Sequence, residues 1–137
     1  MITATEFIND LKTKVFCRIG ASKIQGVGVI AVRPIPKGIN PMQEDRPCVF
    51  ETCTRAAIES AQLPKSIMQL VVDLCPENDG VFDIPNHSLN SCGVAWFLNH
   101  SKTPNMEERD GDFFTLREIA EGEELTVNYG TYGELNL

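Results

Sequence analysis

The stretch Trp96-Phe-Leu-Asn-His-Ser-Lys-Thr-Pro-Asn105 decides the fold of this chain. It contains one of two Asn-His-Ser triplets, and the other lies at residues 86–88. Both triplets match the sequon for N-glycosylation, an interpretation that fails in a cytoplasmic protein. Only the triplet at residues 99–101 is followed by Pro104-Asn105, so His87 is expected to be an ordinary loop residue.

Two further stretches lie on either side of this one, and each is a weak signal by itself. Gly26-Val-Gly28 lies inside a β-branched segment, where a glycine pair usually marks a bulge or close backbone packing. Without a third glycine that opens a helix, it is no dinucleotide-binding fingerprint. The stretch Gly122-Glu-Glu-Leu-Thr-Val-Asn-Tyr-Gly130 places Tyr129 at the end of a predicted strand, by default as an aromatic at the core edge.

The size of the chain, 137 residues, predicts a single domain over residues 1–137. Hydrophobic residues make up 42% of the sequence and charged residues 23%, which is typical of a folded soluble domain and not of a disordered tail. Twelve Lys and Arg against nineteen Asp and Glu give a net charge of −7. This charge argues against nucleic acid and favours a basic protein partner, although it also serves solubility alone.

Neither a membrane anchor nor a secretion signal is expected. No apolar run approaches the roughly 20 residues of a membrane-spanning helix, and the first residues lack the basic and apolar regions of a signal peptide. We therefore expect a cytoplasmic protein that does not bind membranes. Its five cysteines form no Cys-x-x-Cys pair and indicate free, mostly buried thiols and no metal, with a zinc site or a redox role as the alternatives.

The residue pattern predicts short strands around a helical insert. Thr3 and Glu6 form a capping box, which predicts a helix within residues 1–12. Apolar residues at helical spacing predict a helix at residues 66–74, and residues 54–62 are compatible with another, so residues 54–76 form a helical insert. The fold class is α+β, mostly β, because no βαβ alternation occurs. Strands are predicted at residues 15–19, 27–32, 81–84, 113–118 and 125–129.

Taken together and in order, the three stretches resemble the SET-domain protein-lysine methyltransferases. Residues 22–31 are similar to the family's G-x-G segment, residues 96–105 to its N-H-S-x-x-P-N motif and residues 122–130 to its E-L-T-x-D-Y-G motif. The resemblance covers roughly residues 13–133, and the helical middle corresponds to the family's variable insert. It implies a fold of several small sheets with a knot-like C-terminal threading.

The resemblance also implies a cofactor, S-adenosylmethionine, and residues that bind it. The backbone at Gly26, Val27 and Gly28 would hold its methionine end, because missing side chains let a ligand approach the main chain. Asn99 and His100 would serve the adenosine and methionine moieties, since an amide offers both donors and an acceptor. His100 is expected to act mainly through its backbone, not as a base.

Tyr129 is the catalytic residue that the resemblance implies, and it also belongs to the implied cofactor contacts. Methyl transfer is an in-line displacement, so alignment of the reacting atoms at roughly 3–3.5 Å contributes more than proton transfer. The attacking lysine must be neutral, although the pKa of a lysine in solution is about 10.4. An apolar channel and the positive sulfonium would lower that pKa, and the Tyr129 hydroxyl would orient the amine.

The sequence departs from the family pattern in two places. Asn128 stands where the family often has aspartate, which removes a charge but keeps the shape, so activity is expected to survive. Only residues 131–137 follow Gly130, and the cysteine-rich zinc module of many members is absent. Tyr132, Leu135, Leu137 or a second subunit is expected to cover the site, which predicts a homodimer or a site completed by a partner. Val127 and Tyr132 are the predicted substrate-channel residues.

The function expected from these motifs is methylation of a lysine side chain on a protein substrate, with S-adenosylmethionine as the methyl donor. The substrate would be a lysine-bearing, basic protein that the acidic chain attracts. The alternative is a SET-like module without catalytic activity that binds the cofactor or a protein partner. A small β-rich binding domain that does not use the methyl donor is a third, weaker hypothesis.

Overall fold

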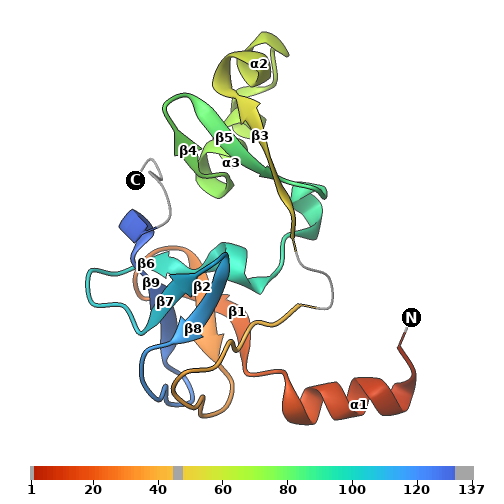
Figure 1. Cartoon of the computed structure of the whole chain (residues 1–137), viewed down its shortest axis with the longest axis vertical. Helices are drawn as coiled ribbons and strands as arrows, with labels where there is room; N and C mark the ends of the chain where they lie inside the picture. Colours follow the sequence, from red (N-terminus) through yellow and green to blue (C-terminus); the bar gives the residue numbers. More distant parts are fainter. Residues whose placement is uncertain (1, 45–47, 132–137) are drawn as a thin grey trace. The chain divides into compact units, whose positions relative to one another are not determined.

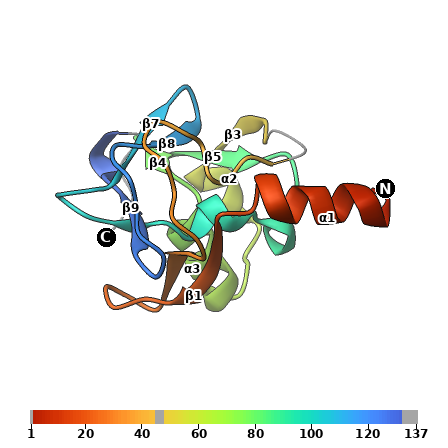
Figure 2. The ribbon, with the colours of Figure 1, turned by 90° about the horizontal axis from the view of Figure 1, so that it is seen from below.

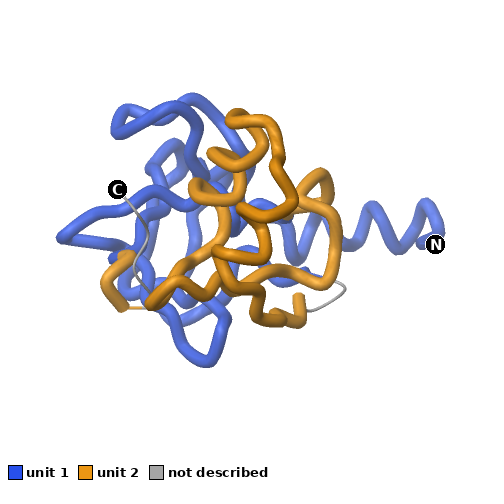
Figure 3. The backbone as a smooth tube through the Cα atoms, turned by 90° about the horizontal axis from the view of Figure 1, so that it is seen from above, with its two compact units in different colours: residues 1–45, 93–128 blue, residues 46–92, 129–137 orange. Residues whose placement is uncertain are grey.

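The computed structural model describes residues 2–44 and 48–131 of the chain. Contacts between residues divide the chain into two compact units (Figure 3). Unit 1 consists of the described residues within Met1–Asp45 and Gly93–Asn128, and unit 2 of those within Arg46–Cys92 and Tyr129–Leu137. The expectation of a single domain over residues 1–137 stays a prediction.

Unit 1 is built around a four-stranded sheet. β1, β2 and β9 pair in antiparallel fashion, whereas β6 is parallel to β9. Valine, isoleucine and threonine recur in these strands, because β-branched side chains suit a pleated, half-buried surface. In sheet order, the strands are β1 (Cys17–Ala21), β2 (Val27–Ala31), β9 (Glu124–Val127) and β6 (Asn99–His100) (Figure 1).

The core of unit 1 gathers side chains from this sheet and from two further pairings. One is a hairpin of β7 (Met106–Arg109) and β8 (Asp112–Thr115). The other is an isolated bridge in which Ile35 and Ile119 exchange backbone hydrogen bonds of 2.8 and 2.9 Å. Burial of apolar area in this cluster is the main force that holds the unit together. Its buried apolar residues are Val29, Ala31, Ile35, Leu98, Met106, Ile119, Leu125 and Val127.

β9 is held from both sides, which produces the predicted knot-like threading. β2 pairs with it on one side and β6 on the other, and the loop after β6 returns to the same strand. Ser101 N donates to Val127 O at 2.9 Å. The Asn105 side chain accepts from Thr126 N and donates to Glu124 O, both at 2.8 Å. Asn105 is only 4% exposed, and its side chain satisfies two backbone groups of β9.

α1 (Ala4–Thr13) precedes the sheet and carries the predicted capping box. Glu6 N donates to Thr3 Oγ1 at 3.1 Å, and Thr3 N donates to Glu6 Oε2 at 2.7 Å. At the other end, the Arg33 guanidinium donates to the carbonyl oxygens of Leu11 and Lys12, which a helix end leaves without backbone partners. No residue of α1 is buried, and the helix extends away from the strands of unit 1 (Figure 2).

Unit 2 combines a three-stranded antiparallel sheet with two short helices. The sheet order is β3 (Phe50–Thr54), β5 (Val81–Pro85) and β4 (Glu77–Asn78). The helices α2 (Arg55–Ser60) and α3 (Lys65–Leu74) lie within the predicted insert at residues 54–76. Phe82 of β5 is fully buried. Arg55 lies over its ring and binds the Glu77 carboxylate with two hydrogen bonds of 2.7 and 2.8 Å, which joins α2 to β4.

Some strands differ from the sequence prediction. β1 begins two residues later than predicted, because its register with β2 pairs Cys17 with Ala31. β3, β4, β6 and β7 were not predicted, since their polar and charged residues form strands only through pairing with β5, β9 and β8. The remaining described elements are three 3₁₀ turns, η1 (Leu89–Ser91), η2 (Val94–Phe97) and η3 (Tyr129–Thr131).

The cysteines are less buried than the sequence predicted. Only Cys75 is buried, and the other four are partly exposed, so the expectation of mostly buried thiols is wrong. Cys17 and Cys53 lie in β1 and β3, which are edge strands with one open side. Across residues 2–44 and 48–131, no helix has the length and apolar character that crossing a membrane requires.

Replacement of Asn105 by alanine is expected to destabilise the protein by about 2–4 kcal/mol. The change leaves the buried Thr126 N and the partly buried Glu124 O without their partner, and each unsatisfied buried group costs about 1–3 kcal/mol. Urea unfolding measures the loss, with Asn90→Ala as the exposed control, expected within about 0.5 kcal/mol of wild type. Equal stability of the two variants would contradict the role given to Asn105.

Two thiols are expected to react slowly in the folded protein. Burial raises the pKa of Cys17 to about 11, and burial together with the Cys92 thiol raises the pKa of Cys75 to about 11. At pH 8 such a thiol is about 0.1% thiolate, so alkylation is expected to be about 100-fold slower than in the unfolded chain and to accelerate as pH rises. Peptide mapping after iodoacetamide treatment measures both rates. Equal rates in folded and denatured protein would show that these thiols are not shielded.

Candidate functional site

The turn between β1 and β2 contains the Gly-x-Gly motif at residues 26–28. Gly26 has a φ of 51°, a left-handed backbone conformation that favours glycine. Ser22 N donates to Gly26 O at 2.9 Å and closes the turn. Apart from its chain neighbours, no described atom lies within 4 Å of the position that a Cβ on Gly26 would take. The backbone there is accessible to an approaching group.

Gly28 lacks a side chain for another reason. A Cβ at this position would collide with the Glu124 carboxylate and would come within 3.0 Å of Asn99 Nδ2. The missing side chain therefore makes room for two polar side chains of the same unit. This packing is a second reason for glycine at position 28, in addition to the close approach of a ligand that the sequence suggested.

The Asn99 side chain joins the first motif to the second. Its amide nitrogen has four acceptors within hydrogen-bond distance, two of them backbone carbonyls of the turn. Its Oδ1 atom has no hydrogen-bond donor in the described part of the chain. The Asn99 side chain is therefore oriented with its Nδ2 atom toward the turn and its Oδ1 atom away from the turn. The four acceptors are Val27 O at 3.0 Å, Gln25 O at 3.2 Å, Ser22 Oγ at 3.0 Å and Glu124 Oε2 at 2.9 Å.

His100 is placed by the parallel pairing of β6 with β9, in register with Val127. Ser101 N donates to Val127 O, so the backbone of Ser101 faces β9. Neighbouring residues of a strand direct their backbone groups to opposite sides, so the N–H and C=O groups of His100 face the outer side of β6. β6 is the last strand of its sheet. The backbone role expected for His100 stays a prediction.

The predicted catalytic and channel residues lie at the end of β9 and beyond it. Val127 is the last residue of β9 and is 1% exposed. Tyr129 follows two residues later, begins η3 and is half-buried; it belongs to unit 2. Tyr132, Leu135 and Leu137 lie outside the described residues. The structure thus places Val27, Gly28, Asn99, His100 and Val127 in one sheet, with Gly26 in the turn just before β2.

A charged cluster fixes the turn that leads into β9. Arg117 donates to both oxygens of the Glu123 carboxylate, at 2.6 and 3.2 Å, and Ala120 N donates to the same group at 3.2 Å. The Arg117 guanidinium therefore lowers the pKa of Glu123, and the carboxylate raises the pKa of Arg117. Asn105 Nδ2 adds a bond of 3.4 Å to Glu123. The cluster positions the chain immediately before Glu124.

Sequence reasoning missed three residues that organise the site: Ser22, Glu124 and Asn105. All three lie in the quoted motifs, but the alternation Glu-Leu-Thr-Val in β9 assigns Glu124 to a solvent-facing side. In the structure that side is occupied by Ser22 and Asn99, which bind Glu124. The only signal that the sequence offered for these three residues was that each is a polar residue within one of the motifs.

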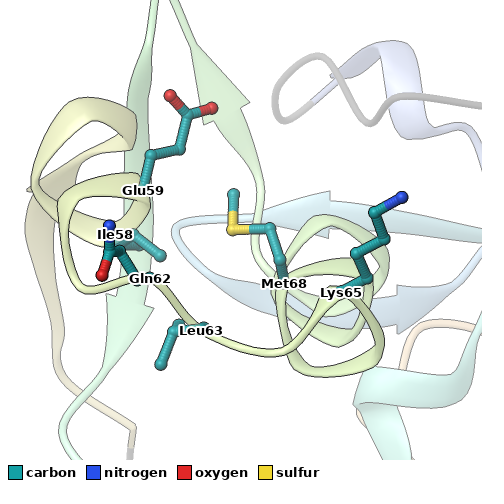
Figure 4. Close-up of a pocket in the computed structure, with 6 residues that line it drawn as sticks. All are labelled: Ile58, Glu59, Gln62, Leu63, Lys65 and Met68. Carbon is teal, nitrogen blue, oxygen red and sulfur yellow. The ribbon is translucent and has the colours of Figure 1, made fainter.

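Unit 2 contains a separate hollow that carries none of the predicted site residues. It lies between α2 and α3, where Met68 of α3 faces the α2 side chains (Figure 4). Its volume of about 200 Å³ is below the roughly 300–1,000 Å³ of small-molecule sites. The hollow is lined by Ile58, Glu59, Gln62, Leu63, Lys65 and Met68.

Comparisons with solved structures show that other proteins share the fold of this chain. A Plasmodium falciparum protein described as a candidate histone methyltransferase superposes with a TM-score of 0.51 at 20% identity, over 85% of this chain and 94% of that one. A humanized mutant of Polycomb Repressive Complex 2 from Chaetomium thermophilum, solved with an inhibitor, gives a TM-score of 0.52 at 16% identity. That match covers 86% of this chain and 15% of the other. At such identities the likeness concerns the fold alone.

Sequence comparison identifies the family. No curated protein matches the chain. The family model of the SET domain matches residues 26–130, which include the Gly-x-Gly turn, both later motifs and Tyr129. The several small sheets, the helical insert and the threading around β9 agree with this match. The chain therefore belongs to the SET-domain family.

Proposed function

We propose that the chain is a protein-lysine methyltransferase that uses S-adenosylmethionine. The observation that supports this most is the Asn99 amide, which binds the backbone of the Gly-x-Gly turn. Through this contact, two motifs separated by about seventy residues in sequence form one polar surface beside β9. The third motif, residues 122–130, supplies β9 itself and continues into Tyr129.

The residues of unit 1 fit a ligand of this chemistry. Gly26 offers an open backbone, and the Asn99 Oδ1 atom offers an acceptor to a donor group such as an ammonium. The backbone groups of His100 on the outer side of β6 are suited to an adenine edge, which has both donors and acceptors. Gly26, Val27, Gly28, Asn99 and His100 would hold the cofactor, which when bound supplies an electrophilic methyl group.

Tyr129 is proposed as the catalytic residue. Only Asn128 separates it from Val127 in the chain, so covalent geometry keeps the Cα atoms of Val127 and Tyr129 within about 7 Å of each other. Val127 is paired with His100, and Tyr129 belongs to the same sequence motif as Val127. Its phenol oxygen would accept a hydrogen bond from a lysine amine and orient the nitrogen lone pair. Such alignment can contribute on the order of 7–11 kcal/mol to a displacement.

The proposed substrate is a lysine-bearing, basic protein. The net charge of −7 supports this, because an acidic surface attracts a cationic segment at long range, an effect that weakens as salt rises. Val127 and Tyr132 are the proposed residues of the lysine channel. A homodimer and a cytoplasmic location are proposed on the sequence alone, as is the absence of direct binding to nucleic acid or membrane.

Tyr129→Phe is expected to reduce methyl transfer by about 100-fold or more, because the variant keeps the ring and loses the oxygen that orients the amine. The assay follows transfer of a labelled methyl group from S-adenosylmethionine to lysines of a mixed protein lysate. Calorimetric binding of the cofactor, expected within about threefold of wild type, shows that the variant is folded. Equal labelling by both proteins would make the tyrosine assignment wrong.

The same measurements separate the competing functions. A wild-type chain that binds S-adenosylmethionine but labels no lysine is the inactive SET-like module. A chain that does not bind S-adenosylmethionine is a binding domain that does not use this donor. Labelled peptides identified by mass spectrometry would name the modified lysine and so the substrate.

A further inference from the structure

Glu124 is half-buried in unit 1, and the proposed function above gives it no role. Its carboxylate accepts from Ser22 Oγ at 2.7 and 3.0 Å and from Asn99 Nδ2 at 2.9 Å. It also occupies the space beside Gly28 that a side chain would otherwise fill. The Glu124 carboxylate thus contacts Ser22 of the turn, Asn99 of the second motif and Gly28 of β2.

The Ser22 hydroxyl requires an acceptor at this position. Three donors lie within hydrogen-bond distance of its oxygen, which is enough to occupy both lone pairs: Ile24 N at 2.9 Å, Gln25 N at 3.2 Å and Asn99 Nδ2 at 3.0 Å. Its one hydrogen is therefore left for Glu124. The two backbone donors, Ile24 N and Gln25 N, belong to the turn. The Ser22 hydroxyl therefore links the Glu124 carboxylate to the backbone of residues 24 and 25 by hydrogen bonds.

The Asn99 amide depends on the same carboxylate. Four acceptors surround its nitrogen, and Glu124 Oε2 is the nearest of them at 2.9 Å. A carboxylate accepts hydrogen bonds and does not donate them, so it selects the orientation with the nitrogen inward and Oδ1 outward. Glutamine at position 124 would have nearly the same shape but would direct an NH₂ group at either the Ser22 hydroxyl or the Asn99 amide.

We propose that Glu124 is a positioning residue for the cofactor, which acts through Ser22 and Asn99 to hold the turn at residues 22–28 and to direct Asn99 Oδ1 outward. The ligand part of this inference rests on the proposed function. Glu124 does not contact the cofactor itself. Its loss is expected to loosen the turn before any ligand is present and to weaken binding of the methionine end.

The test compares wild type with Glu124→Gln, Ser22→Ala, the double variant and Ser22→Thr, and uses Glu121→Gln as the matched control. Glu121 is exposed in the turn before β9 and touches neither Ser22 nor Asn99. Hydrogen exchange is measured on residues 22–28 without ligand, with the β7–β8 hairpin as internal reference. Calorimetry with S-adenosylmethionine gives the dissociation constants, and turnover gives KM and kcat.

Each single variant, Glu124→Gln or Ser22→Ala, is expected to speed exchange of residues 22–28 about tenfold or more and to leave the hairpin unchanged. The dissociation constant and the KM for S-adenosylmethionine are expected to rise about tenfold, with kcat at saturation within about twofold. The double variant is expected to weaken binding by clearly less than the roughly 100-fold of two independent sites, because both residues act in one network. Ser22→Thr keeps the hydroxyl and is expected to behave like wild type.

Unchanged exchange and binding in both single variants would overturn the inference, and so would faster exchange throughout the chain, which marks a general loss of stability. Local loosening with unaltered binding would overturn the link to the cofactor. If wild type itself binds no S-adenosylmethionine, the proposed function fails, and exchange in the ligand-free chain still decides whether Glu124 positions the turn.

Discussion

The structure of unit 1 depends on one constraint, which is that the backbone of β9 must find hydrogen-bond partners on both sides. β2 satisfies one side, and β6, Ser101 and the Asn105 amide satisfy the other. A buried strand cannot leave these groups unpaired without a cost of about 1–3 kcal/mol each. The requirement therefore draws the second motif onto the third and produces the threading around β9.

Once β9 is in place, its polar residues become internal. Glu124 lies beside Gly28 and binds Ser22 and Asn99, so the glycine, the serine and the asparagine are coupled through a strand far from each of them in sequence. This coupling connects fold to function, because the strand that the sheet holds in place carries Glu124, which binds the Asn99 amide. A candidate ligand surface is thereby assembled from a turn, an edge strand and the end of β9.

Much of the fold was predictable from local patterns. The capping box of Thr3 and Glu6, the turn at Gly26 and the β-branched strands β2 and β9 are dictated by neighbouring residues. β3 and β7 were missed because their sequences have weak strand preference and need partner strands. The burial of the cysteines was overestimated, since β1 and β3 proved to be edge strands.

The sequence by itself determined the family, the short strands and the residues Gly26, Asn99, His100 and Tyr129 as candidates, because motif order and turn chemistry are written in neighbouring positions. Only the tertiary structure decided which way the Asn99 amide faces, why Gly28 carries no side chain and that Glu124 and Asn105 point inward. The physical reason is that each of these depends on a hydrogen-bond partner supplied by a segment distant in sequence, and strand alternation alone cannot tell which face another segment will cover.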